Sequence, residues 1–163
     1  MIRAFSILSI VLLPVICARA QATIHPQAQR PRLPLILDTP HFAGLSETVL
    51  RSLLDTSETA TFHRTGVFDV TYSIDGLGML TIYYFDGKAG RFRLILSRPR
   101  SDPEDLPLML GIDTSPLHMR ESIDVKRVWD GRYANAGQTR VVVVAGAHGW
   151  QMAEVTVGSH SPR

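Results

Sequence analysis

The chain has 163 residues, of which 45% are hydrophobic and 20% are charged, and this is enough for one domain with an ordinary hydrophobic core. Its 17 lysine and arginine residues against 15 acidic residues give a formal net charge of only +2 at pH 7. A nucleic-acid-binding domain normally carries a marked basic excess or patch, so this charge balance argues against a nucleic-acid partner.

Residues 1–20 are predicted to be a cleavable secretory signal peptide. Arg3 supplies an early positive charge, and residues 4–17 form an uncharged stretch rich in Ile, Leu and Val. Ala18 and Ala20 then place small side chains at the −3 and −1 positions of a cut. This order is typical of a secretory signal. The alternative is a membrane anchor, but a spanning helix needs about 20 apolar residues and this stretch is shorter.

Removal of the signal peptide changes the chemistry of the chain that remains. Arg3 and Arg19 leave with it and no acidic residue does, so 15 basic residues face 15 acidic ones and the net charge falls to zero. Cys17, the only cysteine, leaves as well, and the bulky Ile16 before it is not typical of a lipoprotein signal. The mature chain is therefore expected to use no disulfide, cysteine nucleophile or thiolate metal ligand.

The first part of the mature chain is predicted to be a flexible leader followed by one helix. Residues 21–34 contain three prolines and few large apolar residues, as leaders do. Residues 33–37 are predicted as a short strand. A helix then begins at Thr39, with Pro40 in its first turn, and its leucines recur at helical spacing until about residue 55.

A change to alternating apolar and polar residues predicts strands after this helix. Residues 68–75, 80–84 and 91–96 alternate in this way and are separated by glycine-containing turns, which predicts an antiparallel meander. Residues 98–116 contain four prolines and several leucines, so they are predicted to be irregular but packed on the sheet.

Three further strands are predicted in the C-terminal part. They are residues 121–129, residues 140–145, which include four consecutive valines, and residues 150–157. Residues 159–163 are predicted to be a disordered tail.

This order of elements predicts an α+β fold, with one N-terminal helix packed on a mainly antiparallel sheet of about five to six strands. Residues 35–158 are expected to form this single globular domain. The alternative is a small β-sandwich with one helix.

Three Asp-Thr pairs, which begin at Asp38, Asp55 and Asp113, are candidates for catalysis because aspartic proteases use two aspartates that share a proton. Those motifs require a glycine after the pair, whereas proline or serine follows here. Helix capping and turn formation explain all three pairs. No catalytic residue is predicted from them.

Histidines could indicate a metal site, and those of the mature chain are His25, His41, His63, His118, His148 and His160. A zinc site needs ligands that converge, commonly two on one helical face, and no such spacing occurs. Neither a dinucleotide fingerprint nor a phosphate-binding loop is present. The sequence therefore predicts no metal site and no cofactor.

A run of cations is the most informative candidate for binding. Lys88, Arg91, Arg93, Arg98 and Arg100 follow one another with no acidic residue between them. Arg91 and Arg93 share one strand face, and Tyr83 on the neighbouring strand is expected on the same face. Such a surface suits an acidic partner or an anionic ligand, although a solvated strand face explains it as well.

A glycine-rich turn is the second candidate for binding. Two glycines flank His148 and are expected to expose it, together with Trp150. Aromatic residues on loops are favoured contact points, but a hairpin with Trp150 buried in the core is the stronger alternative.

The sequence thus predicts an exported protein of the periplasm or extracellular medium that binds a partner without catalysis. Its partner is expected to be an envelope or secreted protein or an anionic ligand, and it is not expected to stay in a membrane once the signal is cleaved. The alternatives are a small hydrolase that uses His118 or His148, and a structural component of the cell envelope.

Overall fold

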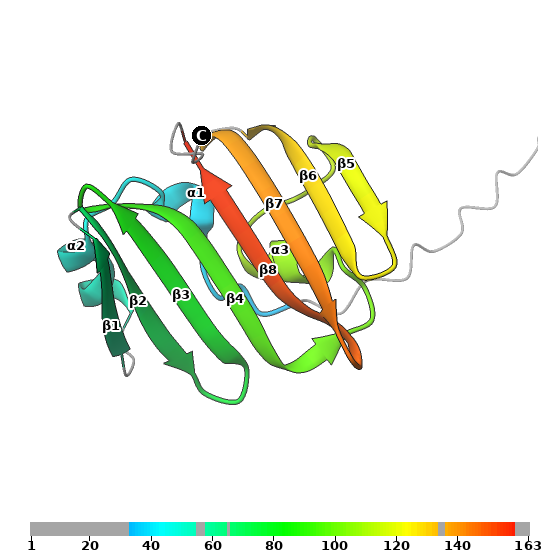
Figure 1. Ribbon diagram of the computed structural model, residues 1–163, viewed down its shortest axis with the longest axis horizontal. Coiled ribbons are helices and arrows are strands. Elements are labelled where there is room, and N and C mark those ends of the chain that lie inside the picture. The colour runs from blue at the N-terminus through cyan, green and yellow to red at the C-terminus, as the bar shows by residue number, and fades with distance from the viewer. Residues whose placement is uncertain (1–32, 55–57, 65, 134–135, 159–163) are drawn as a thin grey trace, which may run out of the picture. The chain divides into compact units, whose positions relative to one another are not determined.

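In the computed structural model, residues 33–54, 58–64, 66–133 and 136–158 are described. They form one eight-stranded antiparallel sheet with three short helices behind one of its faces, as Figure 1 shows. The predicted signal peptide, nearly all of the predicted leader and the predicted tail lie outside the described residues.

Two meanders, the first of strands β1 to β4 and the second of strands β5 to β8, make up this sheet. The three helices are α1 (Thr39–Phe42), α2 (Glu47–Leu53) and α3 (Asp105–Met109). The strands are β1 (Glu58–Arg64), β2 (Val67–Ile74), β3 (Gly78–Phe85), β4 (Lys88–Arg100), β5 (His118–Ile123), β6 (Lys126–Tyr133), β7 (Gly137–Gly146) and β8 (Gly149–Val157). Their order in the sheet is β1-β2-β3-β4-β8-β7-β6-β5, so the fourth and last strands join the two meanders.

The predicted fold class is wrong, because the described residues contain no long N-terminal helix packed on the sheet, and the sheet has eight strands rather than five or six. The β-sandwich alternative is wrong as well, since the eight described strands belong to one sheet.

The predicted helix is interrupted between α1 and α2 by residues that pair with β4 instead. Gly44 has a positive φ of 81°, which ends α1, and its N–H donates to the carbonyl oxygen of Ala89 at 2.8 Å. The N–H of Ala89 donates in turn to the carbonyl oxygen of Leu45. Within α2, Leu50 is fully buried while Val49 remains 43% exposed, so only part of the predicted apolar stripe enters the core.

The alternating runs are confirmed as strands, but two further strands escaped prediction. The predicted meander matches β2, β3 and β4, and the predicted valine-rich strand and last strand match β7 and β8. The predicted strand 121–129 is instead a hairpin of β5 and β6, and β1 was not predicted at all. Residues 33–37 form no strand, although the N–H groups of Ile36 and Leu37 both point to the carbonyl oxygen of Met109.

The hydrophobic core lies between the helices and one face of the sheet, called here the inner face. Alternate residues of the strands supply its sheet side, and the largest of them are Tyr72, Leu80, Ile82, Tyr84, Phe92 and Leu94. Leu50 of α2 and Leu106 and Met109 of α3 supply the helix side. Each such buried side chain stabilises the fold by about 1.5–3 kcal/mol.

Tyr84 is a polar exception within this core. It is completely buried and stacks on Phe68 with ring centroids 4.7 Å apart, and its hydroxyl lies beside the Tyr72 hydroxyl without the geometry of a hydrogen bond to any described group. Burial raises the pKa of this hydroxyl far above its usual value, and the neighbouring Tyr72 raises it further. Desolvation of this hydroxyl therefore lowers the stability of the folded state.

Tyr84→Phe is expected to raise the free energy of unfolding by about 1 kcal/mol, because it removes the unsatisfied hydroxyl and keeps the ring. Urea denaturation measures the change. Tyr133→Phe is the matched control with the opposite expected sign, since the Tyr133 hydroxyl accepts a hydrogen bond from the N–H of Asp113 at 3.2 Å. A loss of stability in Tyr84→Phe would instead mean that the Tyr72 hydroxyl or a buried water holds the Tyr84 hydroxyl by a hydrogen bond.

Candidate functional site

The face of the sheet opposite the helices carries the predicted arginine and tyrosine cluster. On β4, Arg91 and Arg93 alternate with the buried Phe92 and Leu94, so the two arginines point away from the core. None of the described helices lies over this side, which faces the viewer in Figure 1. It is called the open face below.

Strand register brings three predicted site residues together on the open face. Tyr83 of β3 is directly opposite Arg91 of β4, and the guanidinium of Arg91 lies 5.6 Å from the centroid of the tyrosine ring. The guanidinium of Arg93 lies 5.2 Å from the same ring. Both arginines therefore make cation–π contacts with Tyr83. The predicted proximity is present, and their role in binding stays a prediction.

Glu154 of β8 is a member of this cluster that the sequence analysis missed. It stands opposite Arg93, whose Nη2 and Nε lie 2.6 Å and 2.9 Å from its Oε2. Arg91 is less well satisfied, because its buried Nε is 3.7 Å from the other oxygen of Glu154 and has no hydrogen-bond partner among the described groups. Two cations thus share one carboxylate.

The electrostatics of Tyr83 reflect this crowded environment. Burial raises the pKa of its hydroxyl above the usual value, and the positive charge of Arg93 opposes that rise. Asp69 and Glu154 add to the rise, while Arg91 lowers the pKa. Tyr83 therefore stays neutral near pH 7 and presents a ring and a hydroxyl rather than a phenolate.

The other two predicted site residues lie elsewhere. His148 is exposed in the turn between β7 and β8, whereas Trp150 packs into the core with only 8% of its surface exposed. The guanidinium of Arg127 lies 5.5 Å from the tryptophan ring. The structure therefore separates this pair from the arginine cluster, and Trp150 takes the position that the buried-hairpin alternative describes.

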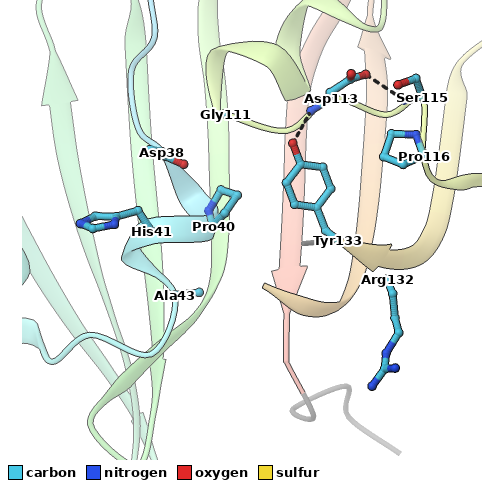
Figure 2. Close-up of a pocket in the computed structure, with 10 residues that line it drawn as sticks. All are labelled: Asp38, Pro40, His41, Ala43, Gly111, Asp113, Ser115, Pro116, Arg132 and Tyr133. Atoms are coloured by element: carbon cyan, nitrogen blue, oxygen red, sulfur yellow. Dashed lines mark hydrogen bonds between the residues drawn. The ribbon is translucent and has the colours of Figure 1, made fainter. Parts of the chain in front are cut away.

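A pocket of about 1000 Å³ opens beside α1, and Figure 2 shows the residues around it. It is called the α1 pocket below. Its lining residues come from the α1 region, the segment after α3 and the end of β6, and they are Asp38, Pro40, His41, Ala43, Gly111, Asp113, Ser115, Pro116, Arg132 and Tyr133.

Backbone hydrogen bonds fix the walls of the α1 pocket. The N–H of Thr39 donates to the carbonyl oxygen of Leu110 at 3.1 Å, which holds the start of α1 against the segment after α3. Gly111 allows this close approach, because it has a φ of +71° and a Cβ there would lie 3.0 Å from the Cα of Asp38. Asp113 is held on the other side by its N–H bond to the Tyr133 hydroxyl. The pocket is thus preformed.

Two of the three Asp-Thr aspartates line this pocket, which the sequence analysis did not foresee. Their side chains do not converge: Asp113 accepts a hydrogen bond from the N–H of Ser115 at 2.9 Å and turns toward it in Figure 2. His41 points away from Tyr133 in the same view. Asp55, which begins the third pair, lies outside the described residues. The arrangement gives no support to a shared-proton protease site.

The hydrolase alternative requires His118 or His148 beside a carboxylate or a serine hydroxyl. Within the described ranges neither histidine has such a hydrogen bond or ion pair, and both are exposed. The same part of the chain contains no group of three or more His, Cys, Asp or Glu side chains placed to hold a metal ion.

Comparison of the chain with protein-family models, with curated proteins and with solved structures finds no match in any of the three. Among the described residues, no helix has the length and apolar character that crossing a membrane requires. The function must therefore be argued from the open face and the α1 pocket themselves.

Proposed function

We propose that this chain is an exported binding protein without catalytic activity, and that its open face captures an acidic segment of another exported protein. The observation that carries the proposal is the cluster at the centre of that face, where both Arg91 and Arg93 lie close to the carboxylate of Glu154. An acidic side chain from a partner adds a negative charge beside Arg91, whose side chain is still 23% exposed.

The chemistry of the cluster is that of a binding hot spot. Arginine and tyrosine are the residue types enriched at such positions, and a guanidinium that already lies on an aromatic ring loses less freedom when it binds. The Arg91 side chain is 23% exposed, so it is partly desolvated before any partner arrives. This favours a charge-assisted contact over a simple surface ion pair.

The surroundings of the cluster supply apolar contact area. Met79, Ile95 and Met152 stand side by side on β3, β4 and β8, on the same face as the arginines. Met79 is 48% exposed. Apolar side chains next to arginine and tyrosine are typical of protein interfaces, and methionine adapts well to a partner surface.

The test measures binding of a labelled ten-residue peptide that alternates Asp with Gly or Ser, by fluorescence anisotropy. Arg91→Gln is expected to raise its Kd about tenfold, the effect of losing one charge-assisted hydrogen bond. Arg51→Gln is the matched control, because Arg51 lies on α2, behind the opposite face of the sheet, and belongs to a different ion pair, with Glu47 at 2.8 Å. The control is expected to change the Kd less than about twofold.

A peptide that alternates Lys with Gly or Ser shows whether charge sign matters, and it is expected not to bind. Thermal melts of both variants confirm that the fold is retained. Equal binding of the acidic and basic peptides contradicts the proposal, and so does an equal loss of affinity in Arg91→Gln and Arg51→Gln.

A further inference from the structure

We infer that the α1 pocket is a second binding site, which takes a small organic ammonium ion between the Asp38 carboxylate and the ring of Tyr133. This site is independent of the open face and of the partner proposed there.

The two sides of the pocket suit an ammonium ion with carbon substituents. In Figure 2 the rings of Pro40 and Tyr133 lie on its two sides, and Asp38 lies at the α1 end. A tyrosine ring attracts a cation through its negative face, and the prolines offer apolar contact to methyl or methylene groups. A volume of about 1000 Å³ leaves room for a molecule rather than a bare ion.

Asp38 is free to bind a ligand. It occupies the N-cap position of α1, yet its side chain makes no capping hydrogen bond. It also has no ion-pair partner in the described part of the chain, whereas Glu47, Glu121 and Glu154 each lie close to an arginine or lysine. Among the described residues, no cation therefore neutralises this exposed carboxylate at the edge of the pocket.

The charge around the pocket selects for a cation. Asp38 and Asp113 contribute two negative charges and Arg132 contributes one positive charge, so the aspartates and arginine of the lining carry a net negative charge. An anionic ligand is disfavoured for that reason. A metal ion is disfavoured as well, because the described residues place no third ligand beside the two aspartates.

Choline is a suitable probe, because 3,3-dimethyl-1-butanol has the same shape without the charge. Choline is expected to bind in calorimetry or in NMR titrations, and the neutral analogue is expected to bind at least about tenfold more weakly. Equal affinity for the two compounds overturns the inference, and so does the absence of choline binding up to about 50 mM, because a cation–π site with a carboxylate is stronger than that.

Substitutions of opposite charge give effects of opposite sign. Asp38→Asn is expected to raise the Kd for choline about tenfold, and Arg132→Gln is expected to lower it about threefold because a repelling charge is removed. Asp75→Asn is the matched control, since Asp75 is exposed in the turn between β2 and β3 and does not line the pocket. If Asp38→Asn and Asp75→Asn change the Kd equally, choline responds only to the net charge of the protein and not to this pocket, and the inference is overturned.

Two substitutions of Tyr133 separate the contribution of its ring to cation binding from that of its hydroxyl, which holds Asp113. Tyr133→Phe keeps the ring and removes only the hydroxyl that binds Asp113, so choline binding is expected to stay within about twofold. Tyr133→Leu keeps a similar apolar volume and removes the ring, and it is expected to raise the Kd about fivefold. A leucine variant that binds choline as well as the phenylalanine variant contradicts a role for the ring.

Discussion

Phe92→Ala is expected to lower the free energy of unfolding by about 3–5 kcal/mol, the largest loss among the substitutions considered. Phe92 is completely buried in β4, where it stands between Ile82 of β3 and Val155 of β8. Its ring therefore fills the inner face where the two meanders meet. Alanine leaves a cavity that neighbouring strands, fixed by hydrogen bonds on both sides, cannot close.

Urea denaturation of both proteins measures this loss. Because the total stability of a domain is about 5–15 kcal/mol, the variant is expected to show a much lower midpoint with an unchanged slope. Met79→Ala is the control, since this side chain is 48% exposed and its loss costs no more than about 0.5 kcal/mol. Similar midpoints for Phe92→Ala and the parent protein contradict the packing described for β4.

Gly78→Ala is expected to cost about 3 kcal/mol, although it adds only one methyl group. Gly78 begins β3 with a φ of +147°, and a Cβ there would overlap the carbonyl oxygen of Ile95 on β4. The obstacle is a backbone atom in a paired strand, so it cannot turn aside as a side chain would. The strand pair must separate locally to accept the alanine.

Gly76→Ala separates the effect of this overlap from that of the backbone angle. Gly76 lies in the same turn with a φ of +70°, and a Cβ there meets no atom within 4 Å. It is expected to cost only about 1 kcal/mol, the price of a left-handed conformation for alanine. Thermal or urea unfolding of both variants gives the comparison, and an equal loss at the two glycines would show that the overlap is relieved without cost.

The sequence predicted strands where one face of a strand is uniformly apolar. β2, β3 and β4 each bury one face and leave the other to solvent, so their period of two is clear. β5 at the sheet edge has almost no buried side chain, and therefore it left no such pattern. The prediction of one continuous N-terminal helix was wrong because Gly44 and Leu45 form backbone hydrogen bonds with Ala89 of β4. This tertiary pairing overrides the helical spacing of the leucines.

The residues of the candidate sites could be grouped from the sequence only where they lie close together along the chain. Alternation placed Arg91 and Arg93 on one face, but their shared partner Glu154 comes from a strand 61 residues beyond Arg93. Likewise Asp38 was explained as a helix cap, and its place in the α1 pocket depends on the hydrogen bond from Thr39 to Leu110, 71 residues further along the chain. Pairings between distant strands carry no signature in a single sequence.

The joining of β4 to β8 also has a consequence for folding during synthesis. Within each meander, strands that are consecutive in the sequence pair as hairpins. In contrast, β4 can complete its pairing only after β8 has been synthesised. Until then its edge exposes unpaired N–H and C=O groups that invite aggregation. The five cations from Lys88 to Arg100 all lie on this strand, and we expect them to act as gatekeepers that repel another copy until β8 arrives.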